Sequence, residues 1–159
     1  IYASEFAEAV SLENFIDSFP EASPALFQSS IHPSAVEQAL IPEKLAIDRF
    51  YPIISDVNLG AKAVESCMLL ADDDVVLVGG EERGTWLSPF QLACNDSFAF
   101  CMKLSRSGNG IGRITFNCNQ PGDTSDDLDF PSFAQAIQNR KSIVLPSFAL
   151  GGWLQVDWL

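Results

Sequence analysis

The sequence has little of the chemistry from which most hydrolytic and transferase sites are built. It contains a single histidine, His32, which lies just before a proline in a stretch rich in proline and serine. No glycine-lysine-serine or glycine-lysine-threonine sequence occurs, and no G-x-S-x-G sequence occurs either, which excludes a P-loop and a hydrolase nucleophile elbow. A serine, cysteine or threonine nucleophile activated by a neighbouring histidine is therefore not predicted.

Cysteine is sparse and its spacing is uninformative for metal binding. The chain has four cysteines and no C-x-x-C pair, so a zinc site is not predicted. Free cysteine is commonly buried as a small apolar residue, and the pattern favours reduced thiols in a cytoplasmic protein. No apolar run approaches the roughly 18 residues that a membrane helix needs, so we expect a soluble chain that does not enter the membrane.

Basic residues are also scarce, and this imbalance is the strongest global signal in the composition. The chain has 21 acidic and 9 basic residues, which leaves a formal net charge of −12. Such a surface repels phosphate backbones, which argues against nucleic acid and anionic membranes as partners and favours a partner with a basic surface. The alternative is that the charge serves only to keep the protein in solution.

The remaining composition is that of an ordinary globular protein. With 159 residues, 47% of them apolar and 12 of them phenylalanine, the chain predicts a single domain over residues 1–159 with one core. The first half has helical periodicity, notably over Ser4–Phe19 and Asp56–Leu70, and a further helix is predicted to begin at Phe130. We therefore expect an α+β fold, in which a helical N-terminal half packs on a mainly antiparallel sheet formed by the C-terminal half.

Two stretches of the second half alternate between apolar and polar residues, as half-buried strands do. These are residues 98–105 and 112–118, which are separated by a glycine-rich segment. Directly paired residues share a face of a sheet, and a loop of odd length would match Phe100 with Phe116. The sequence therefore predicts a hairpin between the two stretches.

The stretch ADDDVVLVGGEERG, residues 71–84, resembles a strand that leads into a phosphate-binding glycine loop. The spacing of its glycines does not fit G-x-G-x-x-G, and Glu81 and Glu82 stand where a phosphate would have to bind. We interpret the stretch as a buried strand over Val75–Val78 followed by a glycine turn.

Aspartates are dense in two places, around residue 73 and around residue 126. Neither run has the spacing of an EF-hand loop, so we expect solvated loops and no bound metal. Trp86 lies in a turn-rich segment and is a candidate interface anchor, because tryptophan is enriched at binding hot spots.

These observations predict an acidic protein-binding module, such as an inhibitor, an antitoxin-like or a chaperone-like protein, which captures a basic partner and needs no cofactor. An enzyme is not favoured, but one alternative is an enzyme or small-ligand binder with a Phe-lined pocket and a buried carboxylate, for which Glu65 is one candidate. A second alternative is a structural subunit or a piece of a longer chain, and the oligomeric state stays open. The predicted partner-binding residues are Asp72, Asp73, Asp74, Glu81, Glu82, Trp86, Asp126, Asp127 and Asp129.

Overall fold

The computed structural model describes residues 1–4, 9–30, 34–55, 57–70, 74–81, 96–106, 110–119 and 128–159. The elements along the chain are β1 (Tyr2–Ala3), α1 (Ala9–Asp17), α2 (Pro24–Ser29), α3 (Ser34–Leu40), β2 (Pro52–Ile53), α4 (Leu59–Leu70), β3 (Val75–Glu81), β4 (Phe98–Leu104), β5 (Gly112–Asn117), α5 (Phe130–Gln138), β6 (Ile143–Ser147) and β7 (Gly152–Trp158). The expected α+β fold class is confirmed.

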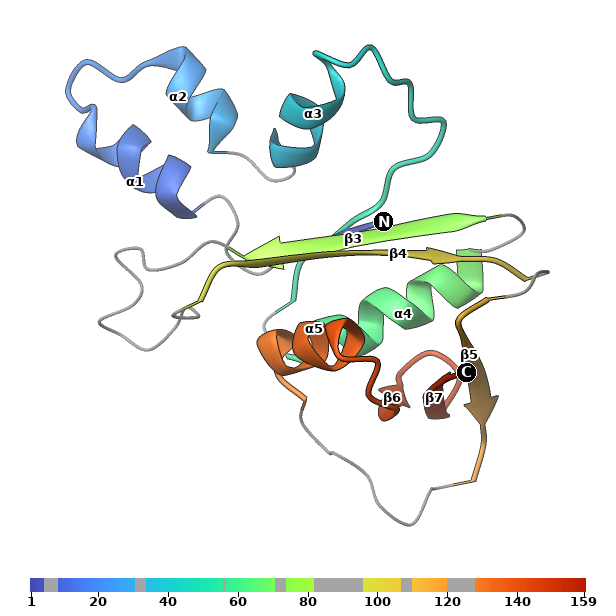
Figure 1. The fold of residues 1–159 in the computed structure, drawn as a ribbon. Coiled ribbons are helices and arrows are strands. Elements are labelled where there is room, and N and C mark those ends of the chain that lie inside the picture. Colours follow the sequence, from blue (N-terminus) through green and yellow to red (C-terminus); the bar gives the residue numbers. More distant parts are fainter. Residues whose placement is uncertain are drawn as a thin grey trace.

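The strands form two sheets with a pair of helices between them (Figure 1). Sheet A has the order β2-β1-β3-β4, in which β1 runs parallel to both its neighbours and β4 is antiparallel to β3. Sheet B has the order β5-β7-β6 and is antiparallel throughout. The helices α4 and α5 lie between the two sheets, and α1 to α3 lie on the other side of sheet A. The N-terminal half is thus less purely helical than expected, because it supplies β1 and β2.

The core lies in the middle layer, where α4 and α5 pack on each other and on both sheets. Phe130 and Phe133 of α5 are fully buried, as the predicted apolar stripe of this helix requires. The predicted helix over Asp56–Leu70 begins later than expected, at Leu59, and Val57 is exposed. The buried cluster draws on both sheets, with residues Ala3, Leu59, Ala61, Ala63, Val64, Cys67, Leu77, Phe130, Phe133, Ala136, Ile137, Ile143, Leu145, Leu154 and Val156.

The predicted hairpin between the strands at 98–105 and 112–118 is wrong. β4 pairs with β3, so that Phe100 lies opposite Gly79, and β5 pairs with β7, so that Phe116 lies opposite Leu154. The two strands belong to different sheets. Alternation fixes which side chains share a face of a strand, but several strands of this chain offer an apolar face of the same period, so alternation does not select the partner.

The glycine pair of the ADDDVVLVGGEERG stretch lies inside a strand and not in a turn. β3 continues through Gly79 and Gly80 to Glu81, beyond the predicted end at Val78. A Cβ atom on Gly79 would lie 2.6 Å from the ring of Phe100 on the neighbouring strand. Glycine is therefore needed at this position because an aromatic ring occupies the space of a side chain.

Among the described residues, no helix is both long enough and apolar enough to cross a membrane.

Candidate functional site

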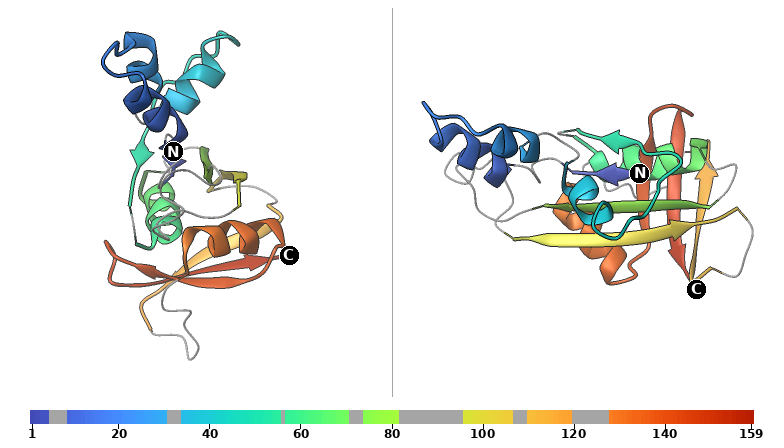
Figure 2. Two further views of the ribbon diagram at one scale, coloured as in Figure 1. Left: turned by 90° about the vertical axis from the view of Figure 1, so that its left-hand side faces the viewer. Right: turned by 90° about the horizontal axis from the view of Figure 1, so that it is seen from above.

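One side of the molecule brings together the open edge of sheet A, the start of α4 and the turn between β6 and β7 (Figure 2, left). The segments that meet here carry five large apolar residues whose side chains are exposed, and we call this surface the lateral face. Their exposed fractions are 41% for Tyr51, 63% for Ile54, 52% for Val57, 53% for Phe148 and 46% for Leu150. Single exposed apolar residues are ordinary, but a group on one side of a protein marks a candidate interaction surface.

The edge strand β2 favours side-chain contacts over the addition of a further strand. The amide of Tyr2 in β1 donates to the carbonyl oxygen of Tyr51 at 3.1 Å, and the amide of Ser4, just after β1, donates to that of Ile53 at 3.4 Å. The backbone of Pro52 therefore faces the outer edge of the sheet. Proline has no N–H group to donate to a partner strand at that point. A partner at this edge would therefore bind mainly through the apolar side chains around it.

Lys62 of α4 connects the two halves of the lateral face. Its Nζ atom donates a hydrogen bond to Oγ of Ser55, which directly follows the β2 region, at 2.5 Å. The same Nζ atom lies 5.6 Å from the centre of the Phe148 ring, within the range of a cation–π contact. The turn between β6 and β7 is thereby held next to the start of α4.

Beneath the lateral face, the carboxylate of Glu65 is buried, and both of its oxygen atoms accept hydrogen bonds from that turn. Its Oε1 atom accepts hydrogen bonds from Oγ of Ser147 at 2.5 Å, from the amide of Ala149 at 2.9 Å and from the amide of Leu150 at 3.4 Å. Its Oε2 atom accepts from the amide of Phe148 at 3.1 Å.

Burial raises the pKa of Glu65, but the hydrogen bonds from the Ser147 hydroxyl and the three amides outweigh burial and hold the pKa below its ordinary value of 4.5. A general acid or base at neutral pH would need the opposite shift. Glu65 is therefore a structural anion and not the raised-pKa carboxylate that the enzyme alternative requires. Sequence analysis singled out Glu65 but missed its partners, because four donors from one turn leave no recognisable motif in the sequence.

The phenylalanines that could line a ligand pocket instead fill the core. The ring of Phe130 lies 5.5 Å from that of Phe98 and 5.8 Å from that of Phe100, and Phe100 lies 5.6 Å from Phe133. These are edge-to-face contacts at ordinary packing distances. In the part of the chain that the structure describes, the rings pack on one another, and the predicted Phe-lined pocket is not formed by them.

An open groove of about 520 Å³ lies between α5 and the strands β6 and β7. Its volume falls in the range of small-molecule sites. Its lining mixes apolar side chains with amides, hydroxyls and one charge of each sign, and it comprises Leu128, Ser132, Gln135, Ala136, Asn139, Lys141, Ser142, Ile143, Val144, Gln155 and Asp157. No group in this lining has a geometry that indicates a reaction.

Three of the predicted partner-binding acidic residues fall in described stretches, and each has a partner within the chain. Asp74 forms an ion pair with Lys103 at 2.5 Å, and this contact, with a hydrogen bond from Ser105, lowers the pKa of Asp74. Glu81 is buried, and Oγ of Ser4 donates to its Oε1 atom at 3.1 Å. Asp129 is the N-cap of α5 and accepts a hydrogen bond from the amide of Ser132 at 2.8 Å.

These three carboxylates do not form one acidic surface patch, since Asp74 and Glu81 lie at opposite ends of β3 and Glu81 is buried. The other predicted residues lie outside the described stretches, namely Asp72, Asp73, Glu82, Trp86, Asp126 and Asp127. Their part in binding stays a prediction, as it does for the three described residues.

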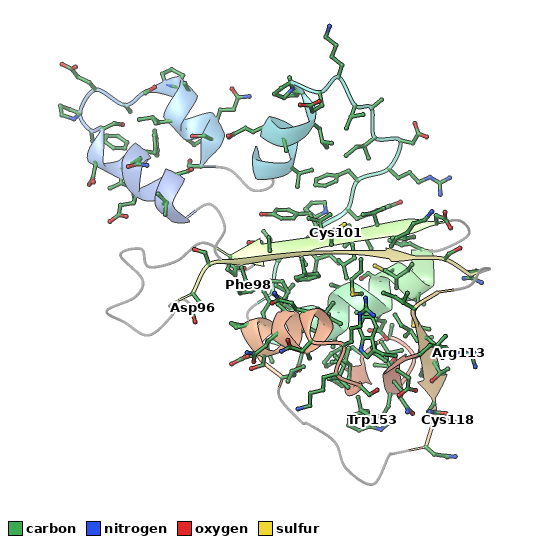
Figure 3. The ribbon with its side chains drawn as sticks, viewed as in Figure 1. Asp96, Phe98, Cys101, Arg113, Cys118 and Trp153 are labelled. Atoms are coloured by element: carbon green, nitrogen blue, oxygen red, sulfur yellow. The ribbon has the colours of Figure 1, made fainter. Side chains whose placement is uncertain are left out.

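Cys67 offers no activated thiolate. Cys67 is buried in α4, and burial raises the pKa of its thiol to about 11. Cys101 and Cys118 are free and exposed, and Figure 3 shows the first on sheet A and the second beyond the end of β5. No group of three or more histidine, cysteine, aspartate or glutamate residues within the described ranges could hold a metal ion.

No family model matches the sequence, and no curated protein matches it. Among solved structures, the chain is similar to one chain in a structure of a ketosynthase (ApeO) in complex with its chain length factor (ApeC) from Xenorhabdus doucetiae. The TM-score is 0.66 at 14% sequence identity, and the match covers 98% of this chain and 67% of that chain. The likeness at this identity is one of fold.

This finding corrects the predicted function. The expected inhibitor, antitoxin-like or chaperone-like module that captures a basic partner is contradicted, because nearly the whole chain is similar in fold to a chain of this ketosynthase complex. The net charge of the sequence predicted the wrong class of protein, since net charge affects solubility and the rate of encounter with a partner and does not determine the fold. The predictions of a single domain, of no cofactor and of no nucleic-acid partner stay predictions.

Proposed function

We propose that this chain is a subunit of a ketosynthase-type complex and that it acts by associating with a ketosynthase. The observation that carries the proposal is the match of 98% of the chain, at a TM-score of 0.66, to a chain from a complex of a ketosynthase with its chain length factor. Fold alone does not define function, so the proposal also needs a surface that can bind a protein.

The lateral face is the surface that supports this proposal. The segments of this face carry the exposed residues Tyr51, Ile54 and Val57, and Lys62 connects them to the turn between β6 and β7, where Phe148 and Leu150 are exposed. Buried apolar side chains at the centre of a contact supply most of the free energy of stable protein association.

The proposal is tested by recovering the protein with an affinity tag from its natural host and identifying the proteins that accompany it by mass spectrometry. We expect a ketosynthase in stoichiometric amount, and a stable complex of both proteins in size-exclusion chromatography with light scattering. Recovery of the chain alone, or with proteins unrelated to ketosynthases, overturns the proposal.

Matched variants then test the surface. Ile54→Ser removes an apolar side chain from the lateral face, whereas Ile111→Ser removes one that is 60% exposed beside the C-terminal residue Leu159. The C-terminus and the turn between β6 and β7 lie at opposite ends of sheet B (Figure 2, left). The first variant should weaken the complex and the second should not. Equal weakening of the complex by both variants would mean that the ketosynthase does not bind at the lateral face.

A further inference from the structure

The turn between β6 and β7 combines a fixed backbone with exposed apolar side chains. Phe148 and Leu150 are 53% and 46% exposed, although the amides of both residues are bound by a buried carboxylate. Apolar side chains at the tip of an ordinary turn usually move freely, because turns are the most mobile parts of a protein. Here the backbone that carries them is tied to the central helix of the fold.

The carboxylate of Glu65 in α4 makes this connection, because it accepts four hydrogen bonds from the turn. Hydrogen bonds to an ionised group are roughly twice as strong as neutral ones, and the low pKa keeps Glu65 ionised above pH 4.5. Gly151 closes the turn with φ of +67°, a conformation that glycine adopts without strain. The turn is therefore held in one conformation before any partner arrives.

The position of Phe148 is fixed from the side as well. The ammonium group of Lys62 lies over its ring at 5.6 Å, and the same group is bound to Oγ of Ser55. Lys62 thus connects the ring to the segment that leads from β2 into α4. This chain of contacts connects the turn to Ser55, which lies between Ile54 and Val57 in the sequence.

We propose that Phe148 and Leu150 form a preorganised apolar anchor that inserts into an apolar pocket of the ketosynthase partner. The inference rests on the proposed function and deepens it by naming the contact that supplies most of the affinity. Aromatic side chains held rigidly at an interface are typical hot spots, because little conformational entropy is lost when they bind.

The charge of the chain decides between a ketosynthase and a second copy of this chain as the occupant. The formal net charge is −12, so a dimer of identical copies would bring two strongly acidic bodies together. Like-charge repulsion disfavours that association. The anchor is therefore assigned to a different protein.

The test compares three variants in binding to the ketosynthase recovered with the wild-type chain, by isothermal titration calorimetry. Phe148→Ser should raise the dissociation constant about tenfold or more, since truncation of a central aromatic anchor has effects of that size. Phe148→Leu keeps an apolar side chain and should retain most of the affinity. Ile111→Ser is the control for loss of an exposed apolar side chain elsewhere. Because Phe148 is half exposed, all three proteins should fold, and thermal unfolding verifies that they do.

The outcomes separate the two proposals. If the wild-type chain binds a ketosynthase and Phe148→Ser binds equally well, the anchor is refuted while the proposed function stands. If the wild-type chain binds no ketosynthase, both fall. If instead the wild-type chain forms a dimer that Phe148→Ser dissociates, the anchor binds a second copy and the assignment to a ketosynthase is wrong.

Discussion

Gly60 of α4 and Phe133 of α5 approach each other so closely that the aromatic ring occupies the space of a side chain on the glycine. A Cβ atom at position 60 would lie 2.4 Å from Cγ of Phe133 and 2.7 Å from two further ring atoms. Phe133 has no exposed surface, and the clash involves the base of its ring, so the ring has nowhere to move. This contact sets how closely the two central helices approach, and with them the position of Glu65 beneath the lateral face.

Replacement of Gly60 by alanine should therefore destabilise the protein, although alanine is the better helix former. The gain in helix propensity is about 1 kcal/mol, and overpacking a filled core opposes it with about 1–3 kcal/mol or more. We expect a net loss of free energy of unfolding, measured by urea denaturation.

The double variant Gly60→Ala/Phe133→Leu gives the control for this contact. Shortening the aromatic side chain makes room for the new methyl group, so the effects of the two substitutions should not add. If Gly60→Ala raises stability on its own, the close approach of the two helices is wrong.

Glu65→Gln should reduce stability at neutral pH and leave the molecule less sensitive to acid. The neutral amide cannot accept hydrogen bonds as strongly from the turn between β6 and β7, and one buried partner is left unsatisfied, at about 1–3 kcal/mol. The pKa of Glu65 is lower in the folded protein than its ordinary value of 4.5, so its stabilising effect is full above that value. It is lost as the pH falls through the lower folded pKa.

Chemical denaturation of wild type and Glu65→Gln at a series of pH values tests this sign. The difference in free energy of unfolding should be constant from pH 7 down to about pH 5 and then shrink below pH 4.5, where the wild-type carboxylate gains its proton. Ser147→Ala removes one donor and keeps the charge, so its smaller effect should retain a wild-type dependence on acid. A difference that grows as the pH falls would contradict the ionised state of Glu65.

Thiol reagents should distinguish the described cysteines. Cys67 is buried and its pKa is raised to about 11, so it is protonated and shielded at pH 8. Cys101 and Cys118 are exposed and should react within minutes with iodoacetamide or a maleimide. Mass spectrometry of peptides from native and urea-treated protein should locate label on Cys67 only after unfolding. Rapid labelling of Cys67 in the native state would mean that α4 opens readily.

The sequence predicts where helices and strands lie better than it predicts which strands pair with each other. The helix that begins at Phe130 was predicted from its apolar stripe, and its N-terminal proline and buried face are both observed. The pairing of β4 with β3 was not predicted, because period-two alternation is the same for every half-buried strand and contains no information about the neighbouring strand. Pairing between strands distant in the chain depends on the packing of α4 and α5, which a local pattern does not encode.

The same limit applies to the candidate site. Exposed apolar residues such as Ile54 and Phe148 lie 94 positions apart in the chain, and they share a face only because α4 and the turn after β6 meet there. Charge, in contrast, is visible in any linear sequence, and it drew attention to aspartates whose described members serve local structure. A functional surface built from distant apolar side chains leaves no contiguous signal, whereas a cluster of carboxylates does.

Substitution of two of those aspartates should reduce stability by different amounts and with a different dependence on salt. Asp129 caps α5 by accepting a hydrogen bond from the amide of Ser132 at 2.8 Å, and loss of such a cap typically reduces stability by about 1 kcal/mol. Asp74 forms its ion pair with Lys103 at an exposed site, where such pairs contribute little to stability and are screened by salt. Asp129→Ala should therefore lower the midpoint of thermal unfolding by a few degrees at any salt concentration. Asp74→Ala should have a smaller effect that disappears in 0.5 M sodium chloride. Equal effects of both substitutions would mean that Asp129 acts through its charge, and the start of α5 would then be held by something other than its cap.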